Sequence, residues 1–136
     1  MRIILFYAPS FWYRTYRKIL EEVPYINVER SATSAVVVFY QAEAEDAEKM
    51  GSVVTKLVKN IKWLAGKFNT KTVVLHSFSH LSLSKAPSAL TGEIIETAKE
   101  KLVRAGYSVT ETPFGYLNEW KLHVAGESLA KVYKEF

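Results

Sequence analysis

Residues 34–41, SAVVVFYQ, constrain the fold more than any other stretch of this sequence. Their density of β-branched and aromatic residues predicts a strand in the centre of a sheet. Shorter apolar runs at residues 2–7 (RIILFY) and 71–76 (KTVVLH) predict two more core strands. The chain has 136 residues, of which 49% are hydrophobic and 24% charged. It is therefore large enough to bury this core as one domain spanning residues 1–136.

Two stretches have the periodicity of amphipathic helices. When residues 45–67 are placed at about 100° per residue, seven apolar side chains fall in one arc and five lysines fall in the opposite arc. Residues 85–106 have a similar apolar stripe, with Pro87 suited to the first turn and Gly106 to the position just after the last turn. We therefore predict two main helices, one before and one after the strand at residues 71–76.

The remaining segments predict the rest of an α/β domain. Residues 9–17 are expected to form a second strand or a hairpin, residues 107–111 and 118–124 two further strands, and the last ten residues a short helix. Within residues 118–124 the period is two, which places Asn118 and Trp120 on the same face. This order of elements predicts a single α/β domain with a mixed, largely antiparallel sheet and two main helices.

Positive charge is concentrated in one part of the chain. Between Lys49 and Gly92 there are seven lysines and no aspartate or glutamate, whereas the rest of the chain has 11 basic and 14 acidic residues. This segregation favours a polyanionic partner such as nucleic acid, although a solvated lysine face has the same pattern. Trp63 falls among the lysines of the first helix, where it can stack on a base, pack on another subunit or lie across the domain edge. The candidate RNA-binding residues are Lys56, Lys59, Lys62, Trp63 and Lys85.

Residues 76–82, HSFSHLS, directly follow a predicted strand and carry the most reactive side chains. The four-residue spacing of His76 and His80 brings two metal ligands together only on a helix, and no nearby carboxylate supplies a third, so we expect no metal site. The chain has no cysteine, no G-x-S-x-G motif and no phosphate-binding glycine loop. These absences argue against thiol chemistry, a serine hydrolase and nucleotide hydrolysis. What remains is a polar cluster at a strand end, where α/β folds commonly bind ligands.

Targeting signals are not evident in the sequence. No segment approaches the 18 apolar residues of a transmembrane helix, and the first apolar run is too short for a signal peptide. The absence of cysteine suits a reducing compartment. We therefore expect a cytoplasmic protein.

Three short motifs resemble those of the archaeal editing domain of threonyl-tRNA synthetase. They are SFSHLS at residues 77–82, APS at 86–88 and TPFGYLNEWKL at 112–122, and the opening MRIILFYAPSFWYR is similar to that family's first strand. The resemblance implies a fold like that of D-aminoacyl-tRNA deacylases and a homodimer. It also implies hydrolysis of serine wrongly esterified to threonine tRNA, without a cofactor and assisted by the terminal ribose 2′-OH. A second, hydrolytic site is needed because serine and threonine differ by one methyl group, worth only about 1–3 kcal/mol in a pocket.

The resemblance also suggests the residues of the site. His80 matches a histidine near the terminal ribose, and Asn118 stands where the family has a lysine that contacts the seryl group and water. An amide can orient a water molecule but cannot supply positive charge. We therefore expect His80 and Asn118 to be the catalytic residues. The expected substrate-binding residues are Ala42, Phe78, Ser79, Phe114, Gly115, Tyr116 and Leu117.

Departures from the family pattern leave three functions open. Leu117 replaces a tyrosine, and Lys131 stands where the family has an acidic residue. The chain can be an active editing domain with a rearranged pocket, in which His80 or His76 assists Asn118. It can be a degenerate paralogue that binds tRNA or accompanies a synthetase, or it can be a D-aminoacyl-tRNA deacylase. The expected partners are the aminoacylated 3′ end of tRNA and the catalytic domain or a subunit of a threonyl-tRNA synthetase. The chain can be a domain of that synthetase or a free-standing protein.

Overall fold

The predicted central strand forms the second half of β2 (Glu29–Gln41) in a computed structural model that describes all residues 1–136. β2 lies between β1 (Arg2–Lys18) and β3 (Thr72–Ser77). The strand order is β4-β3-β2-β1-β5, and β6 also pairs with β1. These three outer strands are β4 (Ser108–Glu111), β5 (Tyr116–His123) and β6 (Lys131–Glu135).

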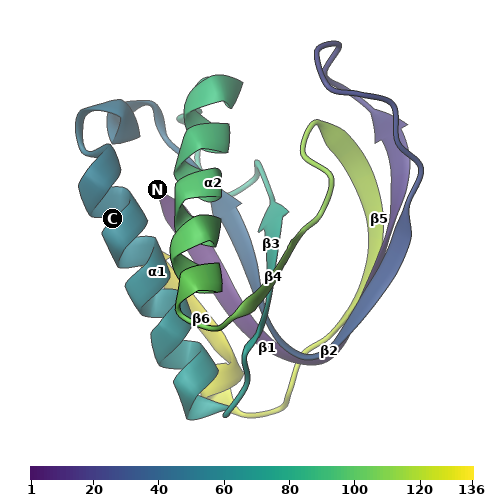
Figure 1. The fold of residues 1–136 in the computed structure, drawn as a ribbon, viewed down its shortest axis with the longest axis vertical. Helices are drawn as coiled ribbons and strands as arrows, with labels where there is room; N and C mark the ends of the chain where they lie inside the picture. The colour runs from purple at the N-terminus through teal and green to yellow at the C-terminus, as the bar shows by residue number, and fades with distance from the viewer.

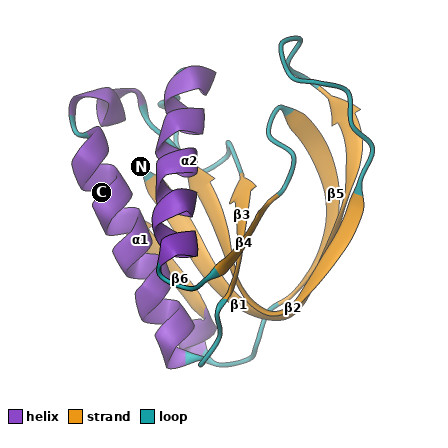
Figure 2. Cartoon of the chain, in the orientation of Figure 1, coloured by secondary structure: helices purple, strands orange, loops and turns teal.

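The sheet is mixed and largely antiparallel, as predicted. β1 runs antiparallel to β2, β5 and β6, whereas β3 is parallel to both β2 and β4. The two parallel connections contain α1 (Met50–Lys67) and α2 (Ser88–Arg104), which lie side by side against the sheet (Figures 1 and 2). Because each helix returns the chain from the end of one parallel strand to the start of the next, the loops after β2 and β3 emerge at the same edge of the sheet.

β1 continues through residues 9–17, where the sequence predicts a separate strand or hairpin. The pairing of β1 with β2 keeps the same register before and after Pro9. In that register Pro9 is opposite Ser34. Pro9 has no N–H to donate, and Ser34 has a φ of 51°. Ala8 and Phe11 nevertheless join the same apolar cluster, although a regular strand would place them on opposite faces. The two strands therefore switch faces together at this point, and β1 and β2 are both curved along their length (Figure 1).

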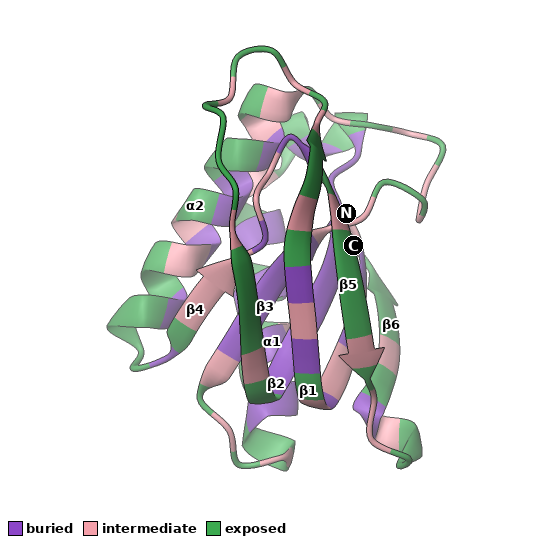
Figure 3. Cartoon of the chain, turned by 90° about the vertical axis from the view of Figure 1, so that its right-hand side faces the viewer, coloured by how far each residue is buried: buried purple, intermediate pink, exposed green.

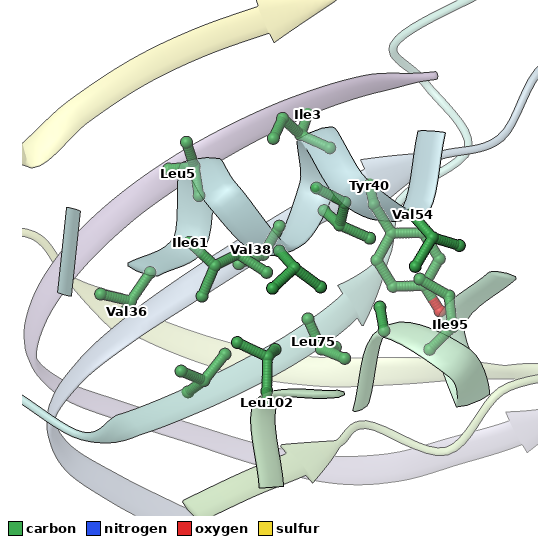
Figure 4. Close-up of a cluster of buried hydrophobic side chains, with 14 of the residues drawn as sticks. Ile3, Leu5, Val36, Val38, Tyr40, Val54, Ile61, Leu75, Ile95 and Leu102 are labelled. Atoms are coloured by element: carbon green, nitrogen blue, oxygen red, sulfur yellow. The ribbon is translucent and has the colours of Figure 1, made fainter. Parts of the chain in front are cut away.

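Each face of the central strands has its own apolar cluster. The larger cluster contains 21 buried residues, among them Val38 and Ile61, and lies between the sheet and the helices (Figure 4). The smaller cluster, which includes Phe11 and Phe39, lies on the other face of the sheet. Residues 35–42 are all buried because both faces are covered. This is why the central run is continuously apolar and does not alternate with polar residues.

The first predicted helix, residues 45–67, is divided into a 3₁₀ turn (Ala44–Glu48) and α1. The turn is fixed by Asp46, whose carboxylate accepts the N–H of Glu43 and the α-ammonium of Met1, each at 2.8 Å. Glu43 also lies 3.2 Å from that ammonium. The two ions of the Met1–Asp46 pair are wholly buried, so this cluster joins the start of β1 to the helical layer.

Two other segments differ from the prediction. The last ten residues form a 3₁₀ turn (Ser128–Ala130) and then β6, because pairing with the first residues of β1 outweighs a helical pattern. α2 begins at Ser88 and not at residue 85, since the N–H of Ala86 donates to the carbonyl of Ala42 at 3.1 Å.

The residues of β5 and β6 are mostly exposed (Figure 3). Neither helix combines the length and apolar composition that crossing a membrane requires.

Candidate functional site

A cavity of about 390 Å³ lies where β3 ends. Its lining comes from the loop after β3, the first turn of α2, the loop after β1 and the turn that leads into β5. Segments far apart in the sequence therefore meet at the carboxyl end of a parallel strand, the edge at which α/β sheets commonly bind ligands.

His76, in β3, lines the cavity although only 4% of the residue is exposed. Its Nδ1 lies 2.9 Å from the Thr112 hydroxyl, and its ring centroid lies 4.6 Å from that of Phe39. Burial lowers the pKa of His76 to about 4. At neutral pH the imidazole is therefore uncharged and serves as a hydrogen-bonding group, not as a cation.

The loop after β3 is held by one buried side chain, Gln41. The Gln41 Oε1 accepts the N–H groups of Leu81 and Ser82, both at 2.8 Å, and Nε2 donates to the carbonyls of Ser82 and Ser84 at 2.8 and 2.9 Å. His80 sits in this loop and is exposed at the edge of the cavity. Four hydrogen bonds from one amide fix the loop before any ligand arrives, which lowers the entropy cost of binding.

The TPFGY turn builds another wall by anchoring the loop after β1. Gly115 has a φ of 83°, and a Cβ there would come within 3.0 Å of the Val23 side chain, so both the backbone and the packing require glycine. The Gly115 carbonyl accepts the N–H of Ile19 at 2.8 Å. The Tyr116 hydroxyl binds the backbone of residues 24–26 twice, accepting an N–H and donating to a carbonyl, both at 2.7 Å. The motif therefore has a structural role.

Asn118, in β5, presents an acceptor that has no donor. Its Nδ2 donates to the carbonyl of Pro113 at 3.2 Å, while its Oδ1 is buried without a hydrogen-bond partner. A buried acceptor of this kind costs about 1–3 kcal/mol unless a ligand or a water molecule donates to it. Trp120, two residues along, also lines the cavity and lies against Phe39 with ring centroids 5.2 Å apart. The two residues share a face, as the period of two predicts.

The cavity brings together most of the residues predicted for the site. His80 and Asn118 line it together with Phe78, Ser79, Phe114, Gly115, Tyr116 and Leu117. Ala42 does not line it, which corrects the prediction. Ala42 directly follows β2 and lies in the apolar cluster beneath the helices, on the same side as Val38 and Tyr40 of that strand.

Some contributions to the cavity are absent from the sequence-based prediction. Ile19 and Leu20 follow β1 in a segment without a regular period, and Ser88 begins α2. The tertiary fold alone brings these residues to the cavity, so no local pattern could have found them. The role of Gln41, by contrast, could have been inferred from the sequence, because a polar residue at the end of a buried apolar run must be hydrogen-bonded.

The predicted RNA-binding residues lie in two places. Lys85 lines the cavity, whereas a separate groove, here called the α1 groove, lies between α1 and β6. Lys134 of β6 lies with its Nζ 6.0 Å from the ring centroid of Trp63, which is 40% exposed. Lys62 is exposed on α1 but does not line the groove. The residues lining the α1 groove are Lys56, Lys59, Asn60, Trp63 and Lys134.

The cavity offers a ligand hydrogen-bonding groups and no acidic side chain. None of its 16 lining residues is aspartate or glutamate, and Lys85 is its only permanently charged residue. It offers hydroxyls, two imidazoles and one amide, but no serine–histidine–acid arrangement. No group of three or more His, Cys, Asp or Glu side chains is placed to hold a metal ion. A ligand held here would thus be positioned by hydrogen bonds.

Relatives of known identity match the whole chain. Residues 1–136 match the family described as the archaea-specific editing domain of threonyl-tRNA synthetase. The chain is 33% identical to a threonine–tRNA ligase of Hyperthermus butylicus, over 100% of this chain and 23% of that protein. It is 30% identical to a threonine–tRNA ligase of Thermococcus kodakarensis, over 97% of this chain and 22% of that protein. The chain thus spans less than a quarter of the length of these curated relatives.

Among solved structures, the fold is similar to that of the c-Myc DNA Unwinding Element Binding Protein. The TM-score is 0.67 at 13% sequence identity, and the match covers 100% of this chain and 99% of the other. At that identity the likeness concerns the fold alone, which is the D-aminoacyl-tRNA deacylase-like fold. The family match over residues 1–136 establishes the identity of the chain: it belongs to the archaea-specific editing domains of threonyl-tRNA synthetase, a family whose role is proofreading.

Proposed function

We propose that this domain hydrolyses the ester bond of seryl-tRNA(Thr), formed when threonyl-tRNA synthetase attaches serine to its tRNA. Membership of an editing family supports a proofreading role, and proofreading of an ester requires its hydrolysis. The observation that carries the proposal is the composition of the cavity, to which all three motifs that resemble those of the family contribute lining residues. The ligand is then the aminoacylated 3′ end of the tRNA, and the domain acts within or beside a threonyl-tRNA synthetase.

The proposed reaction breaks the bond between the seryl carbonyl carbon and the ribose oxygen. A water molecule adds its oxygen to that carbon, a proton passes to the departing ribose oxygen, and serine and free tRNA result. The cavity lacks a carboxylate that could activate a serine or a histidine, so we propose that the ribose 2′-OH assists the water. The unpartnered Asn118 Oδ1 would accept a hydrogen bond from this water or from the seryl hydroxyl, with His80 beside the ribose.

Two substitutions test these roles. His80→Ala and Asn118→Ala should each slow the release of serine from seryl-tRNA(Thr) by about 10- to 100-fold, the effect of losing a hydrogen bond worth roughly 1–3 kcal/mol in the transition state. Single-turnover assays with labelled serine would measure the rates. His123→Ala is the matched control, because His123 is an exposed histidine of β5 outside the cavity lining. Unchanged rates in both cavity variants would contradict the site assignment.

Two other functions are compatible with the cavity. Asn118 brings no positive charge, which favours a degenerate domain that binds the tRNA end without hydrolysing it. Removal of D-amino acids is the other candidate, because the fold by itself does not select the substrate. The same assay separates the three functions when seryl-, threonyl- and D-aminoacyl-tRNAs are compared. Binding without release would identify the degenerate domain, and preferential release of D-amino acids would identify the deacylase.

We also propose that the α1 groove contacts the tRNA backbone away from its 3′ end. Lysines and an exposed indole together are typical of surfaces that bind nucleic-acid strands. Trp63 lies near the end of α1, close in the chain to the start of β3, whereas the cavity lies at the other end of β3. A strand of this length spans about 20 Å, so the groove and the cavity would hold different parts of the tRNA.

The salt dependence of tRNA binding tests the α1 groove. Lys59→Ala and Lys134→Ala should each weaken binding and reduce the slope of log K against log salt concentration by about 0.7–0.9, because each lysine releases about one counterion. Fluorescence anisotropy at several salt concentrations would measure the slopes. Lys101→Ala, an exposed lysine on α2, is the control and should leave the slope unchanged. The same slope in all variants would show that the lysines of α1 are merely solvated.

A further inference from the structure

A second cavity, of about 600 Å³, adjoins the first on the other side of the loop after β3. The two cavities share Ser79, His80 and Lys85, so a ligand can extend from one into the other along this edge. The second cavity is otherwise lined by Arg2 of β1 and by the loop itself, residues 81–83. Apart from these shared residues, the second cavity has no role in the hydrolysis proposed above.

The lining of the second cavity is positively charged. Arg2 and Lys85 are permanent cations, His80 adds an exposed imidazole, and none of the seven lining residues is acidic. Lys85 forms no ion pair with any carboxylate of the chain. An exposed cation without a protein partner, beside an arginine and a histidine, is an arrangement that attracts an anion.

The Glu43 carboxylate and the backbone of Leu81 hold the Arg2 side chain in place. Its Nε lies 3.3 Å from a Glu43 carboxylate oxygen, and its Nη1 donates to the carbonyl of Leu81 at 3.4 Å. Glu43 is only 8% exposed and also accepts a hydrogen bond from the Ser82 hydroxyl at 2.6 Å. Burial alone would raise the pKa of Glu43, but Ser82, the α-ammonium of Met1 and Arg2 outweigh it and keep the pKa below its ordinary value. Glu43 therefore stays ionised and orients the guanidinium.

We propose that the second cavity binds the phosphodiester group that precedes the terminal nucleotide of the tRNA. This inference rests on the proposed function, because the aminoacylated adenosine must occupy the first cavity for its 5′ phosphate to enter the second. A phosphodiester carries one negative charge and two free oxygens, which match a point charge from Lys85 and a guanidinium from Arg2. The loop between the cavities is already fixed by Gln41, so both subsites exist before binding.

Two model ligands isolate the phosphate. Adenosine 5′-(methyl phosphate) contains the diester without a second base, and adenosine lacks it. By calorimetry, the protein should bind the methyl phosphate about tenfold more tightly than adenosine, the gain from a charged hydrogen bond. Arg2→Gln should remove most of this advantage while leaving the affinity for adenosine unchanged, because Arg2 lines only the second cavity. Lys85→Gln should also remove most of the advantage. Lys101→Gln is the matched control on α2 and should keep the advantage.

Several outcomes would overturn the subsite. One is equal affinity of the unmodified protein for the two ligands. Another is tighter binding of the methyl phosphate than of adenosine that persists in both Lys85→Gln and Arg2→Gln. Competition by inorganic phosphate at the concentration of the methyl phosphate ligand would assign the cavity to a free anion instead. Arg2→Lys, which keeps the charge, should retain part of the advantage, and a thermal melt would verify that each variant is folded. These ligands contain no scissile ester, so failure of serine release alone would refute the proposed hydrolysis and leave the subsite standing.

Discussion

Replacing Asp46 with alanine is expected to lower the free energy of unfolding by about 3 kcal/mol, at the lower end of the range for breaking a buried ion pair. The Asp46 carboxylate is wholly buried and accepts hydrogen bonds from the Met1 α-ammonium and the N–H of Glu43. Without Asp46, the ammonium retains only the Glu43 carboxylate at 3.2 Å and the carbonyl of Phe136 as partners. Leaving the buried ammonium with fewer partners lowers the free energy of unfolding by more than the lost hydrogen bond alone contributes.

Urea unfolding would measure this loss as a lower midpoint at an unchanged slope. Glu45→Ala is the matched control, because Glu45 lies in the same 3₁₀ turn but is exposed and reaches Lys49 only at 3.8 Å. Its expected effect is below about 0.5 kcal/mol. Equal effects of the two substitutions would mean that the buried cluster at the start of β1 contributes little to stability.

Acidification from pH 7.5 to pH 4 is expected to remove about 3 kcal/mol of stability through His76 alone. The pKa of His76 is about 4 in the folded chain, against an ordinary value of about 6.5 when the chain is unfolded. Between these values the unfolded chain binds a proton that the folded chain does not bind. The stabilising contribution is therefore complete above about pH 6.5 and is lost as the pH falls toward 4.

The comparison that isolates His76 is between the unmodified chain and His76→Gln. Other groups also titrate in this range, so the quantity of interest is the difference between the two pH profiles of unfolding free energy. Glutamine cannot be protonated, and its profile should fall by about 3 kcal/mol less between pH 7.5 and 4. Parallel profiles would show that the imidazole is already solvated in the folded chain. That result would also remove the reason for treating His76 as a neutral group in the cavity.

Local patterns predicted the elements that local forces stabilise. The apolar arc of α1 and the continuous apolar run of β2 are both buried, because an amphipathic helix and a two-sided strand carry their burial pattern in the order of their residues. The prediction failed where pairing with distant residues decides the structure. Residues 9–17 extend β1 because β2 and β5 pair with them, and the last ten residues contain a strand because β1 is available as a partner.

The residues of the site that were predicted differ from those that were missed for the same reason. The motifs at residues 77–82 and 112–122 were recognisable because their own residues carry them, and the cavity does lie between them. Ala42 was misplaced because its position directly after β2 does not reveal that it packs into the apolar cluster beneath the helices. Ile19 and Leu20 were missed because they reach the cavity through hydrogen bonds to Gly115, almost a hundred residues along the chain.

The sequence by itself determined the class of fold, the two helices, the core strands and the family, since periodicity and short motifs are properties of neighbouring residues. Tertiary structure alone decided that β1 and β2 switch faces at Pro9, that Gln41 fixes the loop of His80, and that Arg2 and Lys85 line the same second cavity. The physical reason is that these arrangements depend on sheet register and on buried hydrogen bonds between distant segments. Such contacts form only when the whole chain has folded.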